Sequence, residues 1–132
     1  MAGANWRALT YGALQRAQRT VASGGIDGTA RVWDVHDPRS PAPIGEPMAG
    51  DAAVVTKVAF TPDGRWLVVG YGNGLARLWD LRRLDNPLLV GGPVAVHEGA
   101  VWSIAFAPRI RLLASGGRDR KVRLWRIRPE IV

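Results

Sequence analysis

The chain has 132 residues, no cysteine and a formal net charge of +7, and 47% of its residues are hydrophobic. This length suits one globular domain with a buried core, and the composition excludes a disordered chain. The lack of cysteine excludes disulfides, thiolate metal sites and a cysteine nucleophile, and it fits a cytoplasmic protein. No apolar run is long enough to span a membrane, and residues 1–20 lack the pattern of a signal peptide, so we expect no membrane contact.

The basic excess is concentrated in one part of the chain. Residues 100–132 hold eight bases and two acids, and sixteen of the eighteen bases in the chain are Arg. Together with the high Ala, Gly and Pro content, this bias is typical of a GC-rich bacterial genome, which explains much of the charge without a ligand. Binding of nucleic acid or phosphate stays open as an alternative.

One segment recurs at a fixed spacing. The sequence LARLWDL at 75–81 returns forty-six residues earlier as TARVWDV and forty-six residues later as KVRLWRI, so that Trp33, Trp79 and Trp125 are in register. A fixed period of this length indicates a repeat architecture. We therefore divide residues 1–132, taken as one domain, into three repeats at 5–35, 36–81 and 82–127.

The first repeat is the least regular copy. Projecting the period backwards places residues 8–14 opposite residues 54–60 of the second repeat, so we predict a strand over 8–14. Leu9 and Leu14 keep apolar positions of that strand, whereas Gly12 replaces a β-branched residue. Residues 1–7 would be a short lead-in.

The second repeat shows the strand pattern most clearly. Its strands are separated by turn residues, Thr-Pro-Asp-Gly at 61–64 and Gly-Asn-Gly at 72–74, which suit tight turns. No segment has helical periodicity, so the chain is predicted to be all-β. The predicted strands of this repeat are residues 54–60, 66–71, 75–81 and about 88–95.

Two proline-containing segments lengthen the repeat, residues 36–47 and 82–93. Proline has no N–H to donate to a strand neighbour, so it is excluded from central strands. The strand that follows each segment is therefore predicted to lie at the edge of its sheet.

These features resemble WD-repeat β-propellers over nearly the whole chain. The resemblance rests on Trp33-Asp34 and Trp79-Asp80 at the end of a strand, on VAFTPDGRWLVVG at 58–70 and on HEGAVWSIAF at 97–106. It implies that each repeat supplies the outer strand of one blade and the three inner strands of the next. The expected fold is a partial propeller of about three four-stranded antiparallel blades, of which the third lacks its outer strand.

The resemblance also implies a buried hydrogen-bonded set of His, Ser or Thr, Asp and Trp in each repeat. The third repeat has all four residues, the first has three of them with Asn5 in place of His, and the second has Asp51, Val69 and Asn73 in place of His, Ser and Asp. Blade two should therefore depend more on packing. The predicted structural set is His97, Ser115, Asp119 and Trp125 in the third repeat and Ser23, Asp27 and Trp33 in the first.

In this family the narrow top face of the blades is the usual recognition surface. Trp and Arg are the residue types found most often as interface anchors. An alternative is that Trp102 packs into a neighbouring loop. The matching positions here are Val54, Thr56 and Gly72 in the second repeat, Ala100, Trp102 and Arg118 in the third, and Ile26 in the first.

No catalytic, metal or cofactor site is predicted. His97, Ser115 and Asp119 have the composition of a hydrolase triad, but they belong to the repeat register and no nucleophile elbow surrounds the serine. His36 lies beside two aspartates and lacks further ligands of the usual type. The glycines at 72–74 belong to no phosphate-binding motif, so a hairpin turn explains them.

Three repeats are too few to close a propeller, which needs about four to eight blades. We expect the chain to be part of a longer propeller or to close a ring by self-association. The predicted function is a non-enzymatic protein–protein interaction scaffold that presents the top face of its blades to a protein or peptide. The resemblance further implies a regulatory module of a larger bacterial protein.

Overall fold

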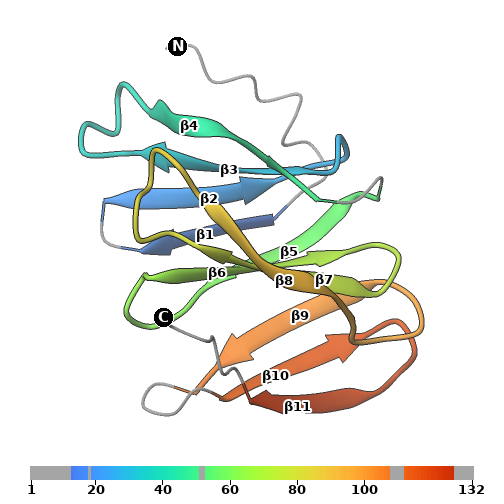
Figure 1. Cartoon of the computed structure of the whole chain (residues 1–132). Coiled ribbons are helices and arrows are strands. Elements are labelled where there is room, and N and C mark those ends of the chain that lie inside the picture. The colour runs from blue at the N-terminus through green and yellow to red at the C-terminus, as the bar shows by residue number, and fades with distance from the viewer. Residues whose placement is uncertain (1–12, 18, 51–52, 108–111, 127–132) are drawn as a thin grey trace.

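The computed structural model describes residues 13–17, 19–50, 53–107 and 112–126. Every regular element in these ranges is a β-strand, and the strands form three antiparallel sheets that follow one another in chain order (Figure 1). The prediction of an all-β fold is confirmed. None of the described segments is a helix that could cross a membrane.

Blade one is a four-stranded sheet with the order β1-β2-β3-β4. Its strands are β1 (Ala13–Ala17), β2 (Thr20–Gly24), β3 (Thr29–Asp34) and β4 (Ala42–Ala49). β4 is the outer edge and is mostly exposed, as the prolines of the preceding segment predict.

Blade two repeats this arrangement with the order β5-β6-β7-β8. Its strands are β5 (Val55–Phe60), β6 (Trp66–Tyr71), β7 (Leu75–Asp80) and β8 (Leu88–Ala95). The predicted bounds agree with these to within one residue at each end. Every residue of β6 is buried, because the sheet is covered on both faces by its neighbours.

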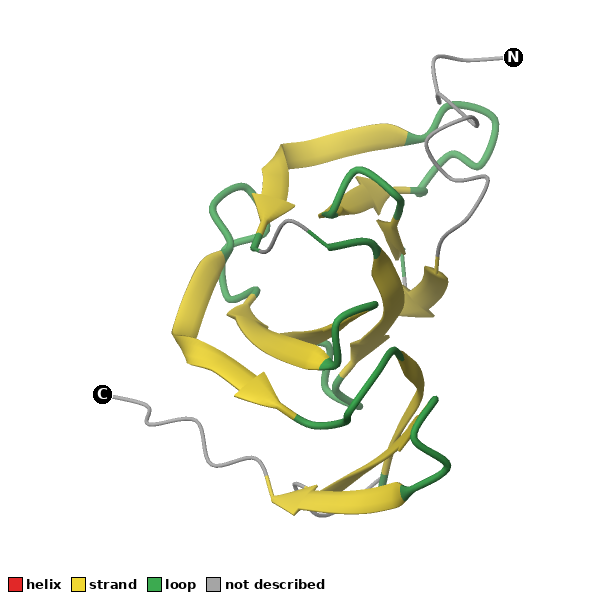
Figure 2. Ribbon diagram, turned by 90° about the vertical axis from the view of Figure 1, so that its right-hand side faces the viewer, coloured by secondary structure: helices red, strands yellow, loops and turns green. Residues whose placement is uncertain are grey.

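Blade three has three strands among the described residues, in the order β11-β10-β9. They are β9 (Val101–Phe106), β10 (Leu112–Gly117) and β11 (Val122–Arg126). The expected absence of an outer strand from this blade holds for the part of the chain that is described. Figure 2 shows the three sheets stacked along one direction rather than closed into a ring.

The first strand is displaced from its predicted position. The prediction was a strand over residues 8–14, of which 8–12 lie outside the described ranges, and β1 runs further along the chain to Ala17. The second repeat pairs Phe60 with Leu67, whereas Leu14, at the position of Phe60, pairs with Ser23 instead of the equivalent Val21.

Turn chemistry explains the displacement. In the second repeat Thr61 and Arg65 donate hydrogen bonds to Asp63 Oδ1 at 2.6 and 3.0 Å, and Gly64 has a φ of +73°. The equivalent stretch of the first repeat begins with Gln-Arg-Ala at 15–17 and contains no Pro, Asp or Gly. No turn is specified there, so strand pairing continues until Ala17 lies opposite Thr20.

Two apolar layers hold the blades together. The layer between blades one and two includes Val32, Val55, Leu67, Val69, Tyr71 and Trp79. The layer between blades two and three includes Ala59, Val68, Ala76, Val101, Ile104 and Leu113.

Glycines let the inner strand of each blade approach the preceding sheet. A Cβ on Gly24 would collide with the Val55 side chain, and a Cβ on Gly70 would lie 2.9 Å from Val101 Cγ1. The two pairs are related by the forty-six-residue period. Since such close contacts leave no room for a side chain, the glycines fix how tightly successive blades pack.

Candidate functional site

His97, Ser115, Asp119 and Trp125 are joined in one chain of hydrogen bonds in blade three. His97 Nδ1 lies 2.9 Å from Asp119 Oδ1, and His97 Nε2 lies 2.8 Å from Ser115 Oγ. Trp125 donates its indole N–H to the same Ser115 Oγ at 2.9 Å. The loop before β9, the strands β10 and β11 and the turn between them are thereby tied together.

The partners determine the direction of these bonds. An ionised Asp119 can only accept, so His97 donates from Nδ1, and its Nε2 accepts the Ser115 hydroxyl proton. The Ser115 oxygen then accepts from Trp125. Each polar atom of the buried imidazole and hydroxyl has a partner, as burial requires.

Asp119 organises the surrounding backbone. It accepts hydrogen bonds from the backbone N–H groups of Glu98 at 3.0 Å and Lys121 at 3.1 Å, in addition to the bond from His97. Burial alone would raise the pKa of this carboxyl, but the three donors stabilise its charged form and the net pKa is lowered.

These hydrogen bonds satisfy the polar atoms of the set and link the segment before β9 to β10 and β11. Ser115 is 2% exposed and His97 is 6% exposed, and the serine oxygen is already engaged by both the imidazole and the indole. Among the described residues no group of three or more His, Asp or Glu side chains could hold a metal ion.

The first repeat has only part of this set in place. Trp33 donates its indole N–H to Ser23 Oγ at 2.9 Å, and Ser23 is buried. Asp27 is exposed and accepts from the backbone N–H and hydroxyl of Thr29, just as Asp119 accepts from the Lys121 backbone N–H. Asn5, the residue expected at the His position, lies outside the described residues.

The second repeat has no equivalent bond at its tryptophan. Trp79 Nε1 is buried and has no acceptor among the described residues. Val69 stands at the position of Ser115, and Asn73 accepts from the Leu75 backbone N–H. The tryptophan is held by the apolar layer around it, which agrees with the expectation that blade two depends on packing.

Two of the predicted top-face residues of blade three, Trp102 and Arg118, are exposed. The surface around these two residues is called the rim of blade three below. The Trp102 side chain is 62% exposed, and Arg118 is also exposed. The Arg118 backbone N–H donates to the Ala100 carbonyl at 2.9 Å, which brings the β10–β11 turn against the segment before β9. Trp102 is not packed into a loop within the described part of the chain.

The predicted partner-binding residues of blade two are less exposed than Trp102 and Arg118. The half-buried Thr56 donates its hydroxyl to the Val101 carbonyl, so it ties blade two to blade three. Val54 is half-buried, and its carbonyl accepts from the Gly72 N–H at 2.9 Å. Ile26 of blade one is 57% exposed. Trp102, Arg118 and Ile26 are therefore the members of the predicted set most available to a partner.

The exposed bases of blade three that the structure describes do not form one patch. Arg118, Arg120 and Lys121 cluster at the β10–β11 turn, whereas Arg126 is at the opposite end of β11. The remaining bases of residues 100–132 are the half-buried Arg123, and Arg109, Arg111 and Arg128, which lie outside the described ranges.

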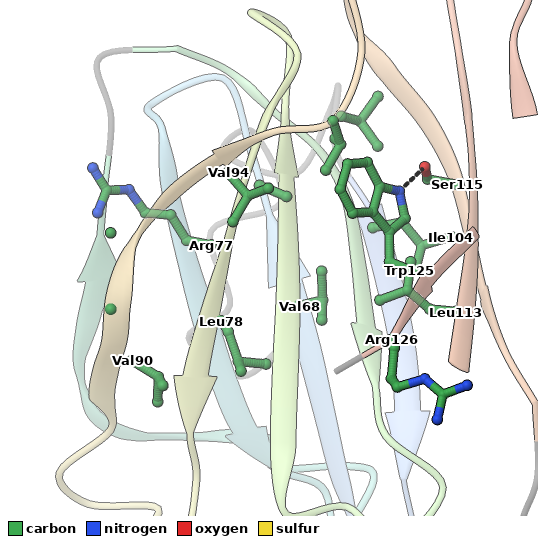
Figure 3. Close-up of a pocket in the computed structure, with 15 residues that line it drawn as sticks. Val68, Arg77, Leu78, Val90, Val94, Ile104, Leu113, Ser115, Trp125 and Arg126 are labelled. Carbon is green, nitrogen blue, oxygen red and sulfur yellow. Dashed lines mark hydrogen bonds between the residues drawn. The ribbon is translucent and has the colours of Figure 1, made fainter. Parts of the chain in front are cut away.

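A groove of about 440 Å³ separates the outer strands of blade two from the Trp125 side of blade three, and the sequence reading missed it. Figure 3 shows Val90, Val94 and Leu78 on one side and Trp125 on the other. The positions of Ile44, Met48 and Tyr71, which help to fill the space between blades one and two, are Val90, Val94 and Gly117 here. Comparing side-chain volumes between repeats would have revealed the groove.

The profile of the WD domain, G-beta repeat (WD40) matches residues 13–34, 46–80 and 91–126, together more than half of the chain. The chain belongs to the WD40 repeat family. Each matched stretch covers the three inner strands of one blade, and the second and third stretches also include the end of β4 or β8, the outer strand of the preceding blade. Members of this family are in general non-catalytic domains that mediate protein interactions.

Solved structures agree with the propeller fold. The computationally designed Ika4 protein is similar with a TM-score of 0.69 at 25% identity, over 86% of this chain and 64% of that one. The designed Ika8 protein gives 0.66 at 25% identity, over 86% of this chain and 32% of that one. Sqt1 of Saccharomyces cerevisiae gives 0.75 at 22% identity, over 90% of this chain and 31% of that one.

The WD40 chain thus spans less than two thirds of Ika4 and about a third of Ika8 and Sqt1. A comparison with curated protein sequences gave no significant match.

Proposed function

We propose that this WD40 chain, taken as one domain over residues 1–132, is a protein-binding scaffold whose recognition surface is the rim of blade three around Trp102 and Arg118. The proposal rests on the 62% exposure of Trp102, which follows Val101 on β9, and on the exposed Arg118, which follows Gly117, the residue paired with Val101. Both residue types anchor interfaces, because they combine a large apolar surface with hydrogen-bond donors. We further propose a cytoplasmic, bacterial setting in which the domain acts within a larger regulatory protein.

The chemistry of the rim favours a peptide that carries both an apolar and an acidic group. The indole face of Trp102 can bury an apolar side chain, and the Arg118 guanidinium can hold a carboxylate in a bidentate pair. Ile26 of blade one occupies the repeat position of Arg118, and it offers an exposed apolar side chain in blade one.

The test starts from a random peptide library selected on the immobilised chain, with the affinity of the selected peptides measured by isothermal titration calorimetry. We expect Trp102→Ala and Arg118→Glu each to weaken binding about tenfold or more, which is the range of an interface anchor. Leu88→Ala is the matched control, because Leu88 is 57% exposed but lies on the outer strand β8. Peptides that bind both rim variants as tightly as the parent chain would contradict the proposal.

Salt dependence separates this function from its alternative, an electropositive site for nucleic acid or phosphate. That alternative is favoured by the exposed Arg118, Arg120 and Lys121 at one turn. A single-stranded oligonucleotide should then bind with an affinity that falls steeply with salt concentration and that is lost in Arg120→Glu. Weak oligonucleotide binding alongside salt-insensitive peptide binding supports the protein-binding function.

A further inference from the structure

We propose that the outward face of blade three binds blade one of a second copy of this chain, head to tail, through a repetition of the contact that already joins successive blades. The outward face is the side of the sheet turned away from blade two. It is defined by Ser103, Ala105, Ala114, Gly116, Val122 and Leu124.

The outward face of blade three contains a glycine, Gly116, at the repeat position of Gly24 and Gly70. Gly24 and Gly70 are the positions at which the next blade lies too close for any Cβ, because Val55 and Val101 pack against them. Gly116 follows at the same forty-six-residue interval. A Cβ there would meet only Ser103 Cβ at 3.8 Å, an ordinary contact, so the fold of blade three itself does not require glycine.

The outward face also exposes two apolar side chains of β11. Their equivalents in blade one, Ala30 and Val32, are 0% and 2% exposed because blade two covers them. Val122 and Leu124 are 77% and 68% exposed. Two large apolar side chains side by side on an open sheet are a typical association surface.

The same contrast holds on the inner strand. Ala59 of blade two is 1% exposed beneath blade three, whereas the equivalent Ala105 is exposed. The outward face therefore has the shape and the polarity of the two internal faces that are covered by a following blade.

The chain itself carries the complementary surface. The side of blade two that covers blade one is built by Leu67, Val69 and Trp79. Blade one has Val21, Ser23 and Trp33 at the same repeat positions, on the side turned away from blade two. Val21 and Trp33 are half-buried, whereas Leu67 and Trp79 are 0% and 8% exposed, so this side of blade one is incompletely covered by the described residues.

These observations favour a second copy over an unrelated partner. A glycine at the close-approach position fits a neighbour with the same strand geometry as blades two and three, and blade one is such a neighbour. Because the two contacting surfaces differ, the contact is heterologous and leads to rings or to open chains of copies.

The assembly contact and the rim proposed for partner binding can be separated by mutation. Trp102 occupies the position of Thr56, which reaches the following blade, so it borders both surfaces and is unsuitable as a probe of assembly. Arg118 lies in the turn beyond β10. Arg118→Glu should weaken peptide binding about tenfold or more and leave assembly intact, so the two proposals can fail independently.

The test is sedimentation velocity of the purified chain over about a hundredfold concentration range, since assembly follows mass action. We expect a multiple of the monomer mass for the parent chain and monomers for Gly116→Val and Leu124→Glu, with unchanged circular dichroism. Leu88→Glu is the control, because Leu88 is exposed but lies outside this face. The Leu88→Glu chain should assemble like the parent chain. A parent chain that stays monomeric throughout, or folded variants that assemble like the parent, would overturn the proposal.

The absence of cysteine allows a second, directional test. Val32 and Leu67 share the apolar layer between blades one and two, and their equivalents across the proposed contact are Leu124 of one copy and Val21 of the other. Mixing Leu124→Cys with Val21→Cys under mild oxidation should yield mainly the mixed disulfide. Disulfides formed only between identical variants would contradict a head-to-tail contact.

Discussion

Trp125 donates its indole N–H to Ser115 Oγ at 2.9 Å, whereas the indole N–H of Trp79, one repeat earlier, has no acceptor among the described residues. The difference follows from a single position, where Val69 replaces the serine. Two blades of one chain thus provide a polar and an apolar solution to the burial of the same tryptophan.

Ser115→Ala should lower the free energy of unfolding by about 1–3 kcal/mol, because it leaves both His97 Nε2 and Trp125 Nε1 buried without a partner. The measurement is chemical denaturation followed by tryptophan fluorescence. Ser103→Ala, at an exposed serine on β9, is the control and should change stability by less than about 0.5 kcal/mol. Equal effects of the two substitutions would show that the hydrogen-bonded set contributes nothing to stability.

Val69→Ser should be more stable than Val69→Ala by about 1 kcal/mol, because the new hydroxyl can accept from Trp79 Nε1 as Ser115 does from Trp125. Both variants lose stability relative to the parent chain, since Val69 is fully buried. A serine variant that is less stable than the alanine variant would mean that the indole cannot reach residue 69.

The stabilisation by Asp119 should disappear in acid. Its folded-state pKa is lowered from the ordinary value of 3.8, because hydrogen bonds to the carboxylate outweigh burial. A lowered pKa stabilises the fold above the unfolded-state pKa, and this contribution is lost as the pH falls through 3.8 towards the folded-state value.

The parent chain should therefore exceed Asp119→Asn in melting temperature at neutral pH, and the gap should narrow below about pH 4. Asp27 and Asp63 also have lowered pKa values, so the comparison with Asp119→Asn is needed to isolate one carboxylate. Glu46→Gln, at an exposed carboxylate on β4, is the control. If the difference in melting temperature between the parent chain and Asp119→Asn did not change with pH, the effect of the substitution would come from packing and not from the carboxylate charge.

The sequence predicted the repeated elements well and the unrepeated ones poorly. The strands of blade two follow the forty-six-residue period, so their bounds could be inferred from it, and the resemblance to WD repeats placed His97, Ser115, Asp119 and Trp125 in one set. The strand at 8–14 was misplaced because the projection assumed a turn that residues 15–17 do not encode. Asp27 was assigned to the structural set by its position, and the described residues show its bonds to Thr29, whereas Asn5 at the His position lies outside them.

Interactions between blades were also beyond reach from sequence. Thr56 was predicted as a partner-binding residue, yet its hydroxyl joins blade two to blade three. Such features depend on how sheets stack, and strand periodicity does not contain that information.

The close contact between Gly70 and Val101 joins blade two to blade three. The positions of the rim, the groove and the outward face all depend on this packing. A Cβ at Gly70 would lie 2.9 Å from Val101 Cγ1, and Val101→Ala removes that atom. Gly70→Ala should therefore destabilise the chain, whereas Gly116→Ala should leave the isolated chain nearly unchanged.

The most direct measurement is a double-mutant cycle of Gly70→Ala and Val101→Ala by chemical denaturation. The stacked blades predict that the double variant loses less stability than the sum of the single variants, with a coupling energy of about 0.5–3 kcal/mol. Strictly additive losses would mean that the two residues are not in contact, and would contradict the packing of blade three on blade two.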